Sequence, residues 1–524
     1  MVATSQPLAV EIGVEILRSG GNAVDAAIAA NVALSLVEPM SCGPGGDLFA
    51  IVAPTGSGRL VGLNASGRAP HGLTLDVFRR QGLGRVPLYG ALSWTVPGCV
   101  DGWAMLHARF GRTPWRELFQ PTIEAARRGF PVTPVIARAW DEASSLLASD
   151  PGSRATFLLE GLAPRAGDSF SNPDLADVLS FIADDGAAGF YHGEPARLIA
   201  ACANSLGSPL SRDDLAACVS SWVEPVALPF RGVEVWELPP NTQGVVALEM
   251  LNILSQFDLR ALEARPVDAA HAFVETKKLA YENRAHFYAD PAFQTIPVER
   301  LLTPEHGRAQ AARIDPDHAA TLVSESEELL ASDTVYITAV DRDRTAVSLI
   351  QSIYYGFGSG ITPPGLGFAM QNRGSLFALD PRHPNTLAPG KRPFHTIIPA
   401  MVTRQGRPAY SFGVMGGDMQ PQGHVQILLN LLVSDMDPQE AGDAPRIRHD
   451  GSSTPTGDAM RDGGVVHLEP KLSEAVGDGL RRKGHRVKVS SEGYGGYQGI
   501  WIDWEGGVLL GGSESRKDGM ALGL

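Results

Sequence analysis

The stretch Asp333–Gly360 reads DTVYITAVDRDRTAVSLIQSIYYGFGSG. Two runs rich in β-branched and aromatic residues, Thr334–Val340 and Thr345–Ile353, flank the polar turn Asp341–Arg344. Alternating side chains on both sides of a short turn predict a β-hairpin. The preceding segment, Glu305–Ala331, is polar and lacks a strand pattern. We therefore expect an exposed loop that changes abruptly into a central strand.

Helical patterns begin the chain. Apolar residues recur at helical spacing in Pro7–Arg18, which predicts a half-buried helix. The next segment, Asn22–Val37, is apolar nearly all round and too short for a membrane span, so it fits a helix packed inside a layered fold. A change to strand periodicity follows, and Leu48–Ala53 with Arg59–Asn64 reads as a second hairpin.

Helices and strands both continue to the C-terminus. Amphipathic helices dominate from about residue 100 to 220, and helical patterns return in Asp268–Arg284, Gly423–Val433 and Lys471–Lys483. Further strands are predicted at Tyr410–Val414, Val465–Leu468, Val487–Ser490 and Gly499–Asp503. Because strands often follow one another through short turns, the pattern favours an α+β fold, a four-layer αββα sandwich, over alternating βαβ units.

The composition indicates a small-molecule substrate. Hydrophobic residues make up 44% and charged residues 19% of the 524 positions, which is typical of a globular protein. The formal net charge of −14 argues against binding nucleic acid or an anionic membrane. Since the sequence has neither a secretory signal pattern nor an apolar run of ~18 residues, we expect a cytoplasmic protein. The first helix pattern starts almost immediately, so the sequence leaves open that an upstream leader has been removed.

No metal or cofactor is expected. The four cysteines, Cys42, Cys99, Cys202 and Cys218, form no C-x-x-C pair and are interpreted as small buried residues. The thirteen histidines include no H-E-x-x-H pair, and no glycine cluster has the G-x-x-x-x-G-K-[ST] form.

Seven segments in order carry a family resemblance. They are GGNAVDAAIAANVALSLVEP, GPGGDLF, VPGCVDGW, the stretch around Thr334, LAPGKRPFHTIIPAM, GVMGGDMQPQGHVQILLNLL and ESRKDGMALG. Together they resemble the γ-glutamyltranspeptidase family over almost the whole chain.

The resemblance implies self-cleavage between Asp333 and Thr334 in a fold of the N-terminal nucleophile hydrolase type. It implies a large subunit, residues 1–333, and a small subunit, residues 334–524, interwoven in one αββα domain as a heterodimer, with further pairing left open.

The chemistry of such a cut can be argued from the residues themselves. A neutral hydroxyl is a poor nucleophile and needs an adjacent base. Cleavage before Thr334 frees an α-amine beside its hydroxyl, and the ordinary pKa of that amine, about 7.7–8.0, suits a base at neutral pH. One cut would thus create both nucleophile and base, and the uncut precursor would be inactive.

The resemblance also assigns roles to other positions. Ser352 falls where a hydroxyl bonds the nucleophile, and Gly416 with Gly417 falls where backbone N–H groups form the oxyanion hole. His395 and Thr396 stand where two serines touch the substrate's carboxylate, and for His395 a packing role is an equal alternative.

Three positions depart from the family pattern. Ser66 replaces an arginine that binds the glutamyl α-carboxylate, and Leu376 replaces an aspartate that receives the α-ammonium group. Tyr354 stands at a third recognition position, usually a small polar residue. Arg373 and Arg68 are candidates to supply the missing positive charge, or are surface arginines.

These departures leave several functions open. The first is a γ-glutamyl amide hydrolase that acts on glutathione-like amides through an acyl-enzyme, with possible transfer to amino-acid acceptors. The second is an acylase for glutaryl or other dicarboxylic monoamides, including cephalosporin side chains. The third is a non-catalytic relative, against which the joint presence of Thr334, Ser352, Gly416 and Gly417 argues.

Overall fold

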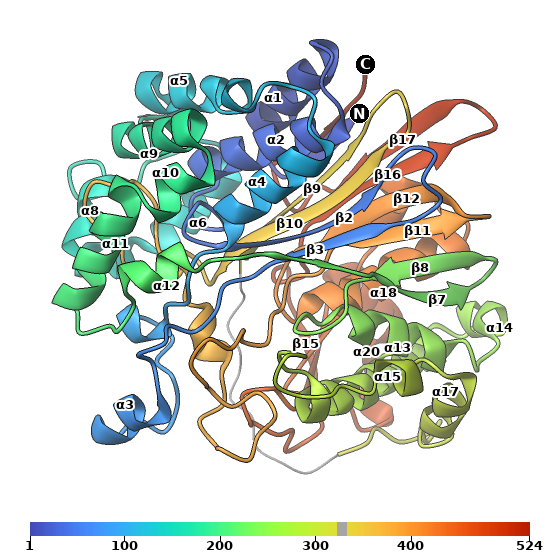
Figure 1. The fold of residues 1–524 in the computed structure, drawn as a ribbon. Coiled ribbons are helices and arrows are strands. Elements are labelled where there is room, and N and C mark those ends of the chain that lie inside the picture. The colour runs from blue at the N-terminus through green and yellow to red at the C-terminus, as the bar shows by residue number, and fades with distance from the viewer. Residues whose placement is uncertain (322–332) are drawn as a thin grey trace.

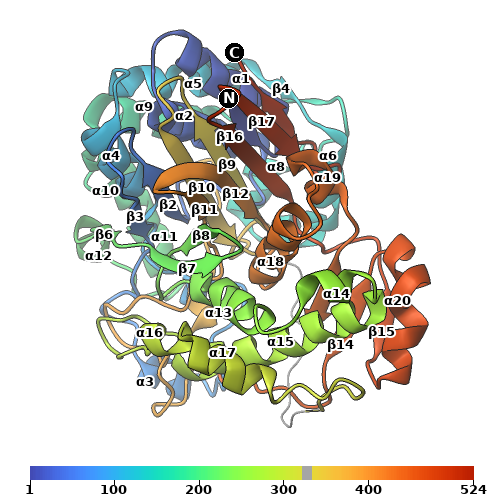
Figure 2. The same ribbon diagram turned by 90° about the vertical axis from the view of Figure 1, so that its right-hand side faces the viewer.

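The computed structural model describes residues 1–321 and 333–524. Two large β-sheets lie face to face at the centre, and helices cover their outer faces (Figures 1 and 2). The prediction of an α+β, four-layer αββα sandwich is confirmed. Within the described ranges, no helix is long and apolar enough to cross a membrane.

The first sheet contains the hairpin predicted from the quoted stretch. Across the described part of the chain its seven strands run in the order β18 (Met520–Leu522), β1 (Val2–Thr4), β9 (Asp333–Val340), β10 (Ala346–Tyr354), β2 (Asp47–Ala53), β3 (Val61–Ala65) and β6 (Ser221–Val223). β9 pairs antiparallel with β10, starting from Val340 opposite Ala346. The register shifts between Gln351 and Tyr354, which brings Tyr354 opposite Asp333.

The second sheet has six described strands. Their order is β17 (Val508–Ser513), β16 (Tyr497–Asp503), β12 (Arg407–Val414), β11 (Ala400–Arg404), β8 (Val233–Glu237) and β7 (Val226–Phe230). Smaller sheets are formed by β13 (Ile447–Asp450), β14 (Val465–Leu468) and β15 (Val487–Val489), and by β4 (Phe130–Pro131) and β5 (Ser169–Phe170). β12 leads directly into the turn at Gly416 and Gly417.

Period-two alternation on β9 explains the layers. Val335, Ile337 and Ala339 pack into a core with the N-terminal helices. Tyr336 and Val340 point the other way, into a core shared with the second sheet. Full burial of each large apolar side chain contributes ~1.5–3 kcal/mol. A slip of one residue would exchange the two faces, so the register of this hairpin is strongly specified.

Helices of the first outer layer share buried residues with that N-terminal core. They are α1 (Pro7–Arg18), α2 (Ala23–Val37), α4 (Cys99–Phe110), α5 (Gln120–Arg128), α6 (Pro134–Glu142), α7 (Ser144–Ser149), α8 (Pro151–Phe157), α9 (Pro173–Asp185), α10 (Ala187–Tyr191), α11 (Glu194–Ser205) and α12 (Arg212–Ala216). The short helix α3 (Leu75–Arg80) lies apart from them and packs in a separate apolar cluster (Figure 1). The predicted helix Asn22–Val37 is α2, and it begins at Ala23 because the Asn22 side chain caps its first turn.

The second outer layer covers the six-stranded sheet. It is formed by α13 (Gly244–Leu254), α14 (Leu259–Glu263), α15 (Pro266–Phe287), α16 (Val298–Leu301), α17 (Pro304–Ala311), α18 (Met419–Leu432), α19 (Pro438–Asp443) and α20 (Pro470–Arg482). Buried residues of α13, α15 and α18 share one core with β8 and β12. The helices predicted at Asp268–Arg284, Gly423–Val433 and Lys471–Lys483 are therefore confirmed as α15, α18 and α20.

The predicted loop Glu305–Ala331 is wrong at its start. α17 occupies Pro304–Ala311, with the Thr303 hydroxyl accepting a hydrogen bond from His306 N–H at its first turn. Threonine at the N-cap followed by proline at the first helical position is a helix-start signal that outweighed the polar composition. Residues 312–321 contain neither helix nor strand, and the rest of the predicted loop lies outside the described residues.

Candidate active site

The nucleophile predicted from the sequence lies at the start of the central hairpin. Thr334 is the second residue of β9 and is buried, with 1% of its surface exposed. Its Oγ1 is 3.3 Å from Oγ of Ser352 on the paired strand β10, and the two hydroxyls are hydrogen-bonded. Tyr354 adopts a φ of +84° and its N–H donates to Ser352 Oγ at 2.8 Å. A bulky residue in this strained region is often found at functional sites.

Arg373 joins the two hydroxyls to a third. It is fully buried at the start of the short 3₁₀ helix Arg373–Leu376. Nη2 donates to Ser352 Oγ at 3.0 Å, and Nη1 donates to Thr396 Oγ1 at 2.8 Å. The guanidinium carbon lies 4.4 Å from the centre of the Tyr354 ring, a cation–π arrangement. The structure thus brings together Thr334 and four residues predicted around it.

The charge of Arg373 has no carboxylate paired with it in the described residues. Burial lowers the pKa of Arg373 to about 10, so the side chain stays protonated at neutral pH. The carboxylate of Asp47 opposes that lowering, but it forms no ion pair with Arg373. Nε of Arg373 also has no partner in the described ranges. A buried, unpaired cation is costly, which makes it a candidate for binding an anionic group.

His395 does not share a hydrogen bond with this group. Its Nε2 is 3.1 Å from Asp47 Oδ2, and its ring packs edge-on against Phe49, with centroids 4.9 Å apart. Burial, reinforced by the nearby charge of Arg373, lowers the pKa of His395 to about 3. Asp47 also accepts hydrogen bonds from backbone N–H groups, including that of Gly67. A neutral, enclosed imidazole favours the packing role that the sequence left open.

The glycine turn has a backbone conformation that favours glycine at both positions. Gly416 and Gly417 have φ values of +112° and +56°, which side chains rarely allow. A Cβ on Gly416 would lie 3.1 Å from Gly495 Cα. Met419 N–H donates back to Gly416 C=O as α18 begins. The N-terminal end of a helix favours negative charge, as an oxyanion hole must.

The residues at the two positions that depart from the family's glutamyl-binding pattern are either hydrogen-bonded to another residue or apolar. Ser66 is buried, and its hydroxyl donates to Asn64 Oδ1 at 2.7 Å. Leu376 belongs to an apolar cluster. Arg68 is partly exposed and lies 3.6 Å from Asp290. Of the two arginines proposed to supply positive charge, Arg373 belongs to the hydrogen-bonded group around Thr334, whereas Arg68 lies beside the carboxylate of Asp290.

Two buried residues of this region were missed from the sequence: Asp47, which contacts His395, and Gln243, which contacts Thr396. Asp47 follows paired glycines in the motif GPGGDLF and begins the buried strand β2. A carboxylate next to an apolar strand could have indicated from the sequence that this side chain has a polar partner. Gln243 donates from Nε2 to the Thr396 carbonyl oxygen at 2.7 Å. Nothing local marks Gln243, because its partner lies 153 positions away.

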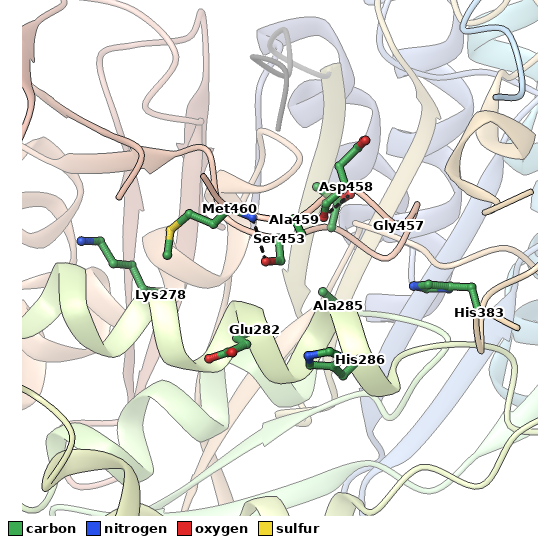
Figure 3. A pocket seen from close by; sticks show the side chains of 11 residues that line it. Lys278, Glu282, Ala285, His286, His383, Ser453, Gly457, Asp458, Ala459 and Met460 are labelled. Carbon is green, nitrogen blue, oxygen red and sulfur yellow. Dashed lines mark hydrogen bonds between the residues drawn. The ribbon is translucent and has the colours of Figure 1, made fainter. Parts of the chain in front are cut away.

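A cavity of about 340 Å³ lies against α15 (Figure 3). Its lining residues are Lys278, Glu282, Ala285, His286, His383, Ser453, Thr454, Gly457, Asp458, Ala459 and Met460. They do not include Thr334 or Arg373. The cavity touches the site's surroundings through Ser453, whose carbonyl oxygen accepts a hydrogen bond from Arg284 at 3.5 Å.

Comparison with known proteins places the chain. A family model described as Gamma-glutamyltranspeptidase matches residues 9–524. This chain belongs to the γ-glutamyltranspeptidase family. It is an enzyme of the N-terminal nucleophile hydrolase type, and the resemblance inferred from its motifs is confirmed.

Similar members of the γ-glutamyltranspeptidase family span the full length of the chain. The glutathione hydrolase-like YwrD proenzyme of Bacillus subtilis is 36% identical over 529 residues, covering 100% of this chain and 98% of that protein. The oxamate amidohydrolase proenzyme of Klebsiella pneumoniae is 35% identical over 532 residues, with the same coverage. The crystal structure of cephalosporin acylase from Bacillus halodurans matches with a TM-score of 0.91 and 40% identity, covering 99% of this chain and 94% of that one.

Proposed function

We propose that the chain is a precursor that cuts itself between Asp333 and Thr334. The Thr334 hydroxyl attacks the carbonyl carbon of residue 333, the peptide nitrogen leaves as the free α-amine of Thr334, and water then hydrolyses the resulting ester. The buried position of Thr334 and its contact with Ser352 support this step. The naming of the Bacillus subtilis and Klebsiella pneumoniae relatives as proenzymes supports it as well.

The two pieces would stay together after the cut. Strands β1, β2, β3 and β6 come from residues 1–333, whereas β10 and β18 and nearly all of β9 come from residues 334–524, and all seven pair in one sheet. Their inter-strand hydrogen bonds and shared cores remain when one peptide bond breaks. We therefore infer a heterodimer.

In the mature enzyme, the free amine of Thr334 would accept the proton of its own hydroxyl. The hydroxyl oxygen then attacks the substrate's amide carbonyl, and the backbone N–H groups at Gly416 and Gly417 stabilise the oxyanion. The protonated amine gives its proton to the leaving nitrogen. Water attacks the acyl ester by the same route, which releases the acid and restores Thr334.

The acyl group we propose is that of a dicarboxylic acid, held as a monoamide by its free carboxylate. The observation that carries this proposal is the buried guanidinium of Arg373, which forms no ion pair with a carboxylate of the described residues and is joined to Thr334 through Ser352. Leu376 offers no anion to an α-ammonium group, and Ser66 offers no cation to an α-carboxylate. Such a site favours a donor with one carboxylate and no ammonium.

The relatives are compatible with this class. Oxamate, named for the Klebsiella pneumoniae relative, is a dicarboxylic monoamide, and the structural relative is named as a cephalosporin acylase. A γ-glutamyl amide hydrolase is the second candidate, because the Bacillus subtilis relative is named glutathione hydrolase-like. In that case the α-ammonium group would need a partner other than Leu376.

Three anilides separate the candidates. Glutaryl, γ-glutamyl and butyryl anilides differ in their α-ammonium and carboxylate groups but present the same scissile bond. We expect the highest kcat/KM for the glutaryl compound. Oxamate, the monoamide of the shortest dicarboxylic acid, tests how short the acyl group can be. A preference for γ-glutamyl anilide would support the second candidate, and equal rates for all three anilides would contradict both. Addition of amino-acid acceptors tests transfer.

A further inference from the structure

Gln243 occupies a junction between the two halves of the proposed site. It is fully buried and directly precedes α13. Its Nε2 donates two hydrogen bonds, to the Thr396 carbonyl oxygen at 2.7 Å and to the Gly417 carbonyl oxygen at 2.9 Å. Its Oε1 accepts one from Arg284 Nη1 at 2.7 Å. Both amide protons are therefore engaged, which leaves the side chain one orientation.

These bonds close a continuous hydrogen-bonded path across the site. From the nucleophile, the path runs through Thr334, Ser352, Arg373, Thr396, Gln243 and Gly417. Thr396 is therefore held at both ends, with its hydroxyl on Arg373 and its carbonyl on Gln243. The path joins the residues proposed to bind the acyl carboxylate with the turn proposed to bind the oxyanion.

Arg284 fixes the far side of the Gln243 amide. It forms a double hydrogen bond with Asp418, at 2.6 and 3.2 Å, while its Nη1 also reaches Gln243. Burial is the largest influence and would raise the pKa of Asp418, but the charge and hydrogen bonds of Arg284, together with the charge of Lys277, lower that pKa overall. Asp418 directly follows Gly417, so the ion pair anchors the same turn from its other end.

Gln243 and Arg284 come from residues 1–333, whereas the nucleophile, the carboxylate-binding residues and the glycine turn all come from residues 334–524. We propose that Gln243 is a positioning residue, supplied by the large piece, that sets the separation between the acyl-binding residues and the oxyanion turn. This inference rests on the proposed function of Thr334 and Gly417. Misplacement of reacting groups by ~1 Å can lower the rate ~10²-fold, so loss of the Gln243 hydrogen bonds should lower kcat.

Two substitutions test the role. Gln243→Met keeps the length but removes all three hydrogen bonds, and Gln243→Glu keeps an acceptor for Arg284 but removes both donors. Gln426 on α18 provides a matched control. Its Nε2 donates to the carbonyl oxygens of Gln422 and Ile447, and its Oε1 accepts from Ile447 N–H. Gln426→Met therefore removes the same number of hydrogen bonds outside the proposed site, from a side chain that is partly buried and bonds only backbone groups.

The readouts are kcat and KM for the amide that the wild-type enzyme hydrolyses fastest, the rate of precursor cleavage, and the thermal unfolding temperature. For both Gln243 variants we expect kcat to fall ~10²-fold with KM changed less than about threefold, together with slower cleavage. Gln426→Met should lower the unfolding temperature to a similar extent as Gln243→Met, with kcat unchanged.

Two results would overturn the positioning role. One is a kcat near the wild-type value in both Gln243 variants, together with a loss of thermal stability like that of Gln426→Met. The other is failure of both variants to fold while Gln426→Met folds, which would make the role of Gln243 structural. An error in the proposed acyl group would show in the substrate panel of the wild-type enzyme. Precursor cleavage needs no added substrate, so its rate tests Gln243 independently of the acyl group.

Discussion

Substitution of Arg373 by methionine should selectively weaken hydrolysis of amides that carry a carboxylate. In the structure two of the guanidinium nitrogens bond Ser352 and Thr396, and the charge has no carboxylate partner within the described residues. A hydrogen bond to a charged group contributes ~1.5–3 kcal/mol. At ~1.4 kcal/mol per tenfold change, loss of one such contact to the substrate should lower kcat/KM by roughly 10- to 150-fold.

The measured quantity is the ratio of kcat/KM for glutaryl anilide to that for butyryl anilide. Removing Arg373 also frees Ser352 and Thr396, and that effect should reduce hydrolysis of both substrates alike. The ratio cancels it and isolates the contact with the carboxylate. Arg373→Lys keeps a charge but loses the planar fork, so we expect an intermediate ratio. An unchanged ratio in Arg373→Met, with both rates reduced equally, would refute carboxylate binding by Arg373.

The remaining predictions concern the nucleophile, the glycine turn and a buried histidine. Thr334→Ala should stay one 524-residue chain with no turnover, whereas Thr334→Ser should still be cut; a denaturing gel and N-terminal sequencing decide this. Gly416→Ala should lower kcat ~10²–10³-fold, because alanine strains the φ of +112° and displaces the proposed oxyanion donors; steady-state kinetics on folded enzyme checks this. Neutral His395 should make the protein acid-sensitive. Its pKa, about 3 when folded and ~6.5 when unfolded, means that its contribution is complete above pH ~6.5 and is lost as pH falls toward 3. Between pH 7 and 5 the loss should be roughly 2 kcal/mol.

Each of these has its own control. Denaturant unfolding of the uncut Thr334→Ala protein, with and without His395→Asn, measures the acid sensitivity on a single chain. A pH dependence that is the same in both would contradict a neutral His395. Cleavage of Thr334→Ala at the same bond would show that another group is the nucleophile. Normal kcat in Gly416→Ala would remove the turn from the mechanism.

Local patterns in the sequence were enough to predict the layers and the family. The hairpin around Thr334 follows from period-two alternation, because the two faces of β9 bury different cores. α2 and α15 follow from their helical patterns in the same way, and the seven motifs, found in order along the chain, indicated the family. Gly416 and Gly417 could be proposed from the motif alone, since a turn that admits close backbone approach needs glycine.

Tertiary structure alone decided which candidates meet. The hydrogen bond between Arg373 and Thr396, the hydrogen bond between His395 and Asp47, and the hydrogen bonds of Gln243 all join distant segments of the chain. Sequence periodicity reports which face of an element is buried, but not which side chain of another element it meets. Packing determines those contacts, and it places Arg373 rather than Arg68 in the hydrogen-bonded group around Thr334.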